Sequence, residues 1–137
     1  LVPDSDAPIN MHWGVDNRTT GLRVPVSPPN QRRVENRVAG ADVNPYLAMA
    51  ASLACGYLGL VEEIEPSAPI ETSAYSLAAK LPRYLEDALL RLNRAKPLKE
   101  IMGERFVDVF TSVKLAESAA YQKVISAWER EYLLLNV

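Results

Sequence analysis

Residues 17–46 read NRTTGLRVPVSPPNQRRVENRVAGADVNPY, a stretch that is unusually rich in arginine. Glu35 is the only acid between its first and last arginines. Guanidinium groups bind phosphates and carboxylates through forked hydrogen bonds. The stretch therefore indicates a site for an anionic ligand. Its arginines are Arg18, Arg23, Arg32, Arg33 and Arg37.

Short extended segments are expected to present these arginines. Residues 22–24 and 33–38 read as strands, and the first of them ends at a proline, which cannot donate to a sheet. Side chains alternate along a strand, so Arg33, Glu35 and Arg37 share one face. A carboxylate between arginines suits a magnesium ion that bridges phosphate oxygens, although a solvated sheet surface with offsetting charges fits the same pattern. The valines of the second strand take the opposite face, towards a core: Val34 and Val38.

A helix is expected over residues 44–61, because Asn44 is a good N-cap and Pro45 suits the first turn. The run from Tyr46 to Val61 is apolar nearly all round, which predicts a helix buried on most sides and packed beneath the sheet. Residues 62–75 contain two prolines among small and acidic residues and read as a surface loop.

The rest of the chain reads as helical, with helices over residues 84–94 and 104–125, a short helix near 97–102, and a tail over 128–137. In the longest helix an apolar stripe predicts core positions. The leucines at 133–135 lie at the chain end, which predicts that they bind a partner surface. The stripe consists of Phe106, Val107, Phe110, Val113 and Ala120.

Composition excludes several classes of protein. The 137 residues, 48% hydrophobic and 23% charged, suit one globular domain with its own core. The net charge of −2 and the lack of a basic block argue against nucleic-acid binding. No apolar run is long enough to span a membrane. The single cysteine, Cys55, cannot form an internal disulfide, which favours the cytoplasm, and the missing initial methionine favours a truncated chain.

The chain resembles the C-terminal part of the glutamine synthetase catalytic domain. Residues 1–8, LVPDSDAP, are similar to the flap loop of that family, and NRTTGLRVP at 17–25 is similar to its NRS…IRIP motif. Residues 32–51, RRVENRVAGADVNPYLAMAA, resemble its RRIEVR-PG-DANPYLALAA motif. The helical block beginning with LPRYLEDAL completes the match. HWGVDNRT and the C-terminal SAWEREYLLLNV further resemble the γ-glutamylputrescine (polyamine) synthetase branch.

This resemblance implies an α+β fold, with a few antiparallel strands within residues 9–38 followed by a mostly helical region. The whole chain, 1–137, would be a C-terminal portion of the catalytic domain. The implied activity is an ATP-dependent glutamate–ammonia or glutamate–amine ligase that forms a γ-glutamyl phosphate intermediate, in glutamine biosynthesis or polyamine metabolism. A truncated chain of this kind is expected to be inactive alone.

The resemblance also assigns roles to individual residues. Arg18 would bridge the transferred phosphoryl group and glutamate, and Arg37 would bind the substrate carboxylate or γ-phosphate. Glu35 would bind the metal, Mg²⁺ or alternatively Mn²⁺. Asp6 stands where the flap carries a glutamate that helps to deprotonate ammonium, and its shorter side chain would suit a larger amine. The arginines that would contact the ATP phosphates are Arg23 and Arg33.

The implied partners are glutamate, ammonia or a polyamine or other amine, and further copies of the chain in a homo-oligomer, a double hexameric ring. Nucleic acid and membranes are not expected partners. A different class of function also fits the sequence: a short non-catalytic paralogue that acts as a binding or assembly module, with the apolar tail docking on ligase subunits.

Overall fold

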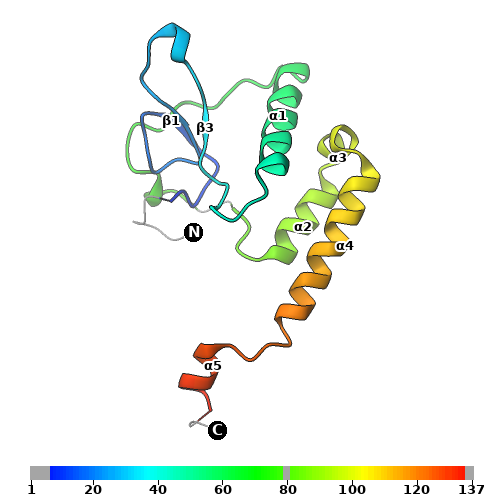
Figure 1. Ribbon diagram of the computed structural model, residues 1–137. Helices are drawn as coiled ribbons and strands as arrows, with labels where there is room; N and C mark the ends of the chain where they lie inside the picture. The colour runs from blue at the N-terminus through cyan, green and yellow to red at the C-terminus, as the bar shows by residue number, and fades with distance from the viewer. Residues whose placement is uncertain (1–6, 79–80, 135–137) are drawn as a thin grey trace. The chain divides into compact units, whose positions relative to one another are not determined.

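The computed structural model describes residues 7–78 and 81–134 of the chain. The chain divides into two compact units, Leu1–Pro82 and Arg83–Val137. The first carries the strands and one long helix, and the second consists of helices (Figure 1). Among the described residues, no helix combines the length and the apolar character that crossing a bilayer requires.

The first unit is built on a small three-stranded sheet with the order β1-β2-β3. Its strands are β1 (Trp13–Val15), β2 (Leu22–Val24) and β3 (Glu35–Asn36), and a 3₁₀ turn, η1 (Pro29–Gln31), lies between the last two. β2 and β3 are antiparallel, as expected, but β1 and β2 are parallel. The α+β fold class is confirmed, whereas the expectation of antiparallel strands is wrong for this pair.

The connection between β1 and β2 explains the parallel pairing. Parallel neighbours usually need a long crossover, yet only residues 16–21 separate these strands. Asp16 has a φ of 51°, in the left-handed region, so the chain turns back immediately after β1. Backbone bonds then tie both ends of the loop, from Asp16 N to Val24 O (2.9 Å) and from Leu22 N to His12 O (3.1 Å).

A segment that we call the strap (residues 67–75) runs along the free edge of β1. Trp13 anchors it twice: its Nε1 donates to Ser67 O (2.7 Å), and its carbonyl accepts from Ile70 N (2.8 Å). The approach is close enough that a Cβ on Gly14 would lie 2.6 Å from Ile70 O. The predicted surface loop is therefore partly a bound edge segment, and glycine at position 14 makes room for it.

The end of the strap contributes to the small core of the first unit. Ala74 is fully buried; its N–H donates to Thr19 Oγ1 (2.8 Å), and its carbonyl accepts from Asn10 Nδ2 (2.9 Å). Asn10 is itself fully buried. The strap ends in the short turn η2 (Ala74–Ser76). Tyr75 lies in this turn, and its hydroxyl donates to Ala7 O (3.0 Å). This core is held largely by polar side chains that satisfy backbone groups.

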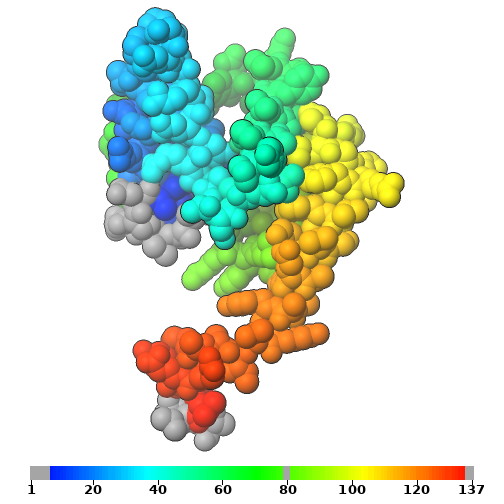
Figure 2. Space-filling model, in the orientation of Figure 1, coloured from blue at the N-terminus to red at the C-terminus, as the bar shows by residue number. Residues whose placement is uncertain are grey.

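The predicted helix after the arginine stretch is α1 (Pro45–Val61). Asn44 is its N-cap, as predicted, and its side chain accepts from the N–H groups of Tyr46 and Leu47. The expectation of burial on most sides is wrong, because Ala54 is the one buried residue of this helix. Figure 2 shows the side chains of α1, turquoise to green, at the surface. Its exposed large apolar residues are Tyr46, Met49, Leu53, Tyr57, Leu60 and Val61.

One hydrogen bond, from Asn36 Nδ2 to Ser52 Oγ (2.9 Å), links β3 to α1 within the first unit. The two valines of the second predicted strand, both expected to face the core, differ in burial. Val34 is 64% exposed, because it precedes the short β3 and lies outside the sheet, so its expected core position is wrong. Val38 is partly buried, and its Cγ2 lies 3.3 Å from where a Cβ on Gly21 would be.

The second unit contains α2 (Leu85–Arg94), α3 (Lys96–Met102), α4 (Glu104–Tyr121) and α5 (Ala127–Tyr132). Leu89 and Val107 form its buried centre, and Asn93 Nδ2 donates to Thr111 Oγ1 (3.2 Å) between α2 and α4. The predicted apolar stripe is buried at Val107 but not at Val113, which is 49% exposed.

The longest helix ends earlier than predicted, at Tyr121 rather than at residue 125. The N–H groups of Lys123 and Val124 donate to carbonyls three residues back, at Ala120 and Tyr121. A capping box then starts α5: Ser126 Oγ accepts from Glu129 N, and the Glu129 side chain accepts from Ser126 N. Of the apolar tail, Leu133 and Leu134 are exposed, and residues 135–137 lie outside the described residues.

Two glycines of the first unit should respond to alanine in opposite ways. Gly14→Ala should destabilise this unit by about 1–3 kcal/mol, because its Cβ would collide with the Ile70 carbonyl. Gly56→Ala, where a Cβ meets nothing within 4 Å, should stabilise it by about 0.5–1 kcal/mol. Denaturation is followed by Trp13 fluorescence in a Trp128→Phe background. Equal effects of the two substitutions would contradict the close approach of the strap.

Candidate functional site

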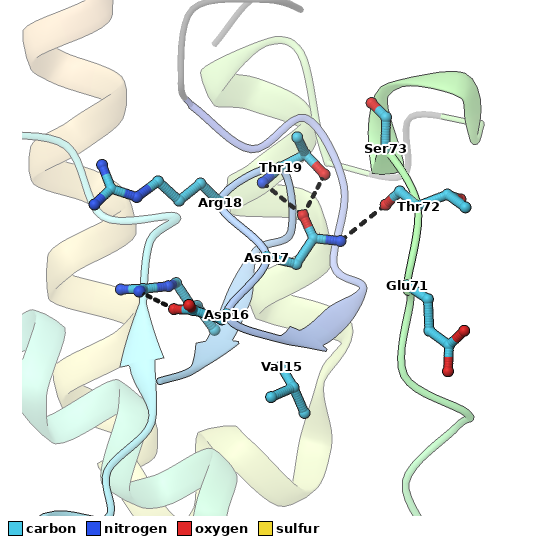
Figure 3. A pocket seen from close by; sticks show the side chains of 9 residues that line it. Val15, Asp16, Asn17, Arg18, Thr19, Glu71, Thr72 and Ser73 are labelled. Carbon is cyan, nitrogen blue, oxygen red and sulfur yellow. Dashed lines mark hydrogen bonds and ion pairs between the residues drawn. The ribbon is translucent and has the colours of Figure 1, made fainter. Parts of the chain in front are cut away.

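Asn17 organises the loop that carries the first arginine. Its Nδ2 donates to the strap carbonyls of Ile70 (2.9 Å) and Thr72 (2.8 Å), and its Oδ1 accepts from the N–H (3.0 Å) and hydroxyl (2.7 Å) of Thr19 (Figure 3). Both donor hydrogens and both acceptor positions of the amide are therefore used. This side chain fixes the 16–21 loop against the strap, and with it the position of Arg18.

Arg18 projects from this loop into solvent beside an open depression of about 520 Å³. Within the described parts of the chain its guanidinium has no partner, whereas its carbonyl accepts a hydrogen bond from Arg37 Nη1. The Arg18 side chain is thus free for a ligand, while its backbone is tied to the segment after β3. The depression is lined by Val15, Asp16, Asn17, Arg18, Thr19, Arg23, Glu71, Thr72 and Ser73.

The other predicted residues form an ion-pair network on the sheet. Arg23 lies opposite Glu35 in the β2–β3 register, and its Nη1 donates to Glu35 Oε2 (2.8 Å). Arg33 Nη2 lies 3.3 Å from the other oxygen, Glu35 Oε1. The Nη2 of Arg23 pairs with Asp16 Oδ1. Two arginines and two acids are therefore joined in one chain of contacts with no net charge.

These contacts shift the protonation equilibria of the network. The Arg23 hydrogen bond is the main reason that the pKa of Glu35 lies below its usual 4.5, and Arg33 adds to the effect. The pKa of Arg23 is raised, first by its bond to Glu35 and then by its bond to Asp16. A guanidinium stays protonated at any physiological pH, so the consequence is that the lowered pKa of Glu35 keeps its carboxylate ionised to a lower pH than that of a free glutamate.

The structure brings the predicted site residues together in two groups. Arg23, Arg33 and Glu35 are in direct contact on the sheet, and Arg18 and Arg37 are joined through the Arg18 carbonyl. Asp6 lies outside the described residues. The expected roles of these residues in binding phosphates, glutamate and metal stay predictions.

The sequence interpretation missed two residues of this site, Asp16 and Asn17. Asn17 belongs to the NRTTGLRVP motif, but the motif does not indicate that its side chain joins the loop to the strap. Asp16 pairs with Arg23 because β1 and β2 are parallel, which sets Gly14 beside Arg23 and Val15 beside Val24. No short-range pattern indicates this pairing, because six intervening residues would ordinarily favour a turn between antiparallel strands.

The described residues do not form a complete magnesium site. No group of three or more His, Cys, Asp and Glu side chains gathers anywhere in residues 7–78 and 81–134. Each oxygen of Glu35 also contacts a guanidinium, from Arg23 or Arg33. Because Mg²⁺ takes about six oxygen ligands, Glu35 would supply one of them and the others would have to come from elsewhere.

Comparison with known proteins gives a consistent result. Residues 1–133 match the family model described as glutamine synthetase, catalytic domain. The chain is 38% identical to type-1 glutamine synthetase 2 of Dictyostelium discoideum, over 98% of its own length and 27% of that protein. It is 36% identical to γ-glutamylputrescine synthetase PuuA of Escherichia coli, over 98% and 29% of the two lengths.

A third relative, the glutamate–isopropylamine ligase of a Pseudomonas species, is 36% identical over 88% of this chain and 27% of its own length. Among solved structures, a GmaS–ADP complex matches with a TM-score of 0.79 and 31% identity, over 94% of this chain and 30% of that one. The chain thus spans less than a third of the length of these relatives.

The ion pair between Arg23 and Glu35 should be detectable through the lowered pKa of Glu35. Because folding lowers the Glu35 pKa from 4.5, the stability that this carboxylate contributes is fully present above pH 4.5 and is lost as the pH falls through the folded value. Arg23→Gln should move the pKa of Glu35 up towards 4.5, as read by carboxyl NMR. Arg18→Gln is the matched control and should leave it unchanged. If the pKa of Glu35 were the same in Arg23→Gln as in wild type, this ion pair would not form in solution.

Proposed function

The chain belongs to the glutamine synthetase family, and on that premise we propose that it is a C-terminal portion of the catalytic domain of an ATP-dependent glutamate–ammonia or glutamate–amine ligase. The observation that carries this proposal is the contact of Arg23 and Arg33 with Glu35 on the small sheet, together with the bond that joins Arg37 to the Arg18 carbonyl in the same unit. Fixed guanidinium groups beside an open depression are what a site for phosphoryl transfer to a carboxylate requires.

In the proposed reaction, ATP phosphorylates the γ-carboxylate of glutamate, and ammonia or an amine displaces phosphate from the γ-glutamyl phosphate. Arg18, exposed beside the depression, stabilises the charge on the transferred phosphoryl group. Arg33, whose side chain is 54% exposed, contacts the nucleotide phosphates. Arg37 holds the Arg18 loop by donating to the Arg18 carbonyl, and it binds the substrate carboxylate.

A divalent ion, Mg²⁺ or Mn²⁺, would supply neutralisation of phosphate charge when bound. Glu35 is the residue of this chain that would hold it, with the Arg23 contact orienting one oxygen and keeping the group ionised. Asp6 would assist removal of a proton from the incoming ammonium or amine.

The similarity to a γ-glutamylputrescine synthetase and a glutamate–isopropylamine ligase supports an amine acceptor, including a polyamine. We further propose that the whole protein acts in the cytoplasm as a homo-oligomer, a double hexameric ring, with the C-terminal leucines at a subunit contact. The exposure of Leu133 and Leu134 supports such a contact, because apolar side chains at a chain end gain stability by burial.

The 137-residue chain alone should not catalyse γ-glutamyl transfer. Its described residues offer one carboxylate for the metal, Glu35, which cannot complete an oxygen-ligand shell. The measurement is phosphate release from ATP with glutamate and ammonia, putrescine or isopropylamine, with heat-denatured chain as the background. Amine-dependent phosphate release by the purified chain would contradict this prediction.

Alanine substitutions of Arg18 and Arg37 should have different effects on kcat and on Tm in a full-length ligase that contains this chain. Arg18→Ala should lower kcat about 10²–10³-fold with no change in Tm, because only the side chain is lost and the carbonyl bond to Arg37 remains. Arg37→Ala should lower both kcat and Tm, because it also removes that bond. Arg105→Ala, an exposed arginine of α4, is the control for a lost surface charge. Wild-type turnover by Arg18→Ala would contradict the role proposed for Arg18.

A further inference from the structure

The position of the Arg18 guanidinium depends on the backbone that carries it, because the guanidinium has no partner among the described residues. That backbone is held at three points. Asn17 and Thr19, on either side of Arg18, both bind the strap, and the Arg18 carbonyl accepts from Arg37 Nη1. A residue that fixes this backbone therefore also fixes where the guanidinium can reach.

The Thr19 hydroxyl contacts both the Arg18 loop and the strap. It accepts from Ala74 N (2.8 Å) and donates to Asn17 Oδ1 (2.7 Å). Neither bond can be reversed, because a backbone N–H only donates and an amide oxygen only accepts. The hydroxyl is thus oriented from both sides. Ala74, whose N–H it satisfies, is fully buried, so water cannot replace the bond.

The contacts of the loop follow alternate residues of the strap. Asn17 donates to the carbonyls of Ile70 and Thr72, and Thr19 accepts from the N–H of Ala74. Figure 3 shows Asn17 directed towards Thr72, with Arg18 extending away from the strap. The two neighbours of Arg18 are therefore bound along one segment, and loosening either of them would let the Arg18 loop move.

We propose that Thr19 is a positioning residue: its hydroxyl locks the Arg18 loop to the strap and so holds Arg18 at the transferred phosphoryl group. The catalytic part of this proposal rests on the proposed ligase function, whereas the lock itself rests on contacts within the first unit. A displacement of about 1 Å in a catalytic group can lower a rate about 10²-fold, so the loss of one hydroxyl should be measurable.

Three variants of Thr19 grade the strength of this lock. Thr19→Ser keeps the hydroxyl, Thr19→Cys keeps a weaker acceptor, and Thr19→Val keeps the shape of the side chain without the hydroxyl. Thr111→Val is the matched control. Thr111 is a partly buried threonine of the second unit whose hydroxyl also accepts a hydrogen bond, from Asn93 Nδ2 (3.2 Å).

The first measurement is amide hydrogen exchange of the 137-residue chain, followed by NMR. Exchange of the Ala74 N–H should be at least about tenfold faster in Thr19→Val than in wild type, Thr19→Ser or Thr111→Val. The Leu22 N–H, bonded to His12 O, is the reference within the same unit and should not change. Unchanged exchange at Ala74 in Thr19→Val would overturn the lock.

The second measurement is steady-state kinetics of a full-length ligase that contains this chain. Thr19→Val should lower kcat at least about tenfold and change the KM for ATP less than about twofold, whereas Thr19→Ser and Thr111→Val should stay within about twofold of wild type. In an Arg18→Ala background, Thr19→Val should lower kcat less than about twofold further, because Thr19 acts through Arg18.

Several outcomes would overturn the proposal. A full tenfold loss on top of Arg18→Ala would show that Thr19 acts by another route, and wild-type turnover by Thr19→Val would show that the lock does not serve catalysis. If Thr19→Val also raised exchange at Leu22, Thr19→Cys would decide, with a kcat between those of wild type and Arg18→Ala expected. An inactive wild-type ligase would contradict the proposed function, and the exchange at Ala74 would still decide the lock.

Discussion

The hydrogen bonds of Asn17 are the interaction on which the first unit depends. Three short strands bury little apolar surface, and the fully buried side chains there include Asn10 and Thr20. Stability must therefore come from satisfied polar groups, and Asn17 satisfies two strap carbonyls and two groups of Thr19 at once. The strap, β1 and the Arg18 loop consequently behave as one structure, although 53 residues separate Asn17 from Ile70.

Charge balance is the second constraint on this unit. Arginines crowded on one small sheet repel one another unless acids separate them, and Asp16 and Glu35 do so by contacting Arg23 from two sides. The arginines differ in exposure as a result. Arg23, between two acids, is only 16% exposed, whereas Arg18 and Arg33 are exposed at the surface.

Many large apolar side chains are exposed in the rest of the chain. Six large apolar side chains of α1 are exposed, and the first residues of the C-terminal leucine cluster are exposed as well. The chain also spans less than a third of its relatives' length. Apolar surfaces of this kind are typical of faces that other protein surfaces cover. The small buried core within each unit shows why sequence hydrophobicity alone overestimated how much of α1 and α4 is buried.

The sequence by itself determined the local features: the family, the arginine stretch, the N-cap at Asn44 and the helical second half all follow from motifs and short-range patterns. The tertiary structure alone decided the parallel pairing of β1 with β2, the binding of the strap and the contact of Asp16 with Arg23. The physical reason is the distance along the sequence between the residues that interact. Caps and helical periodicity join residues a few positions apart, whereas strand direction and side-chain bonds across 50 residues depend on how the whole unit closes.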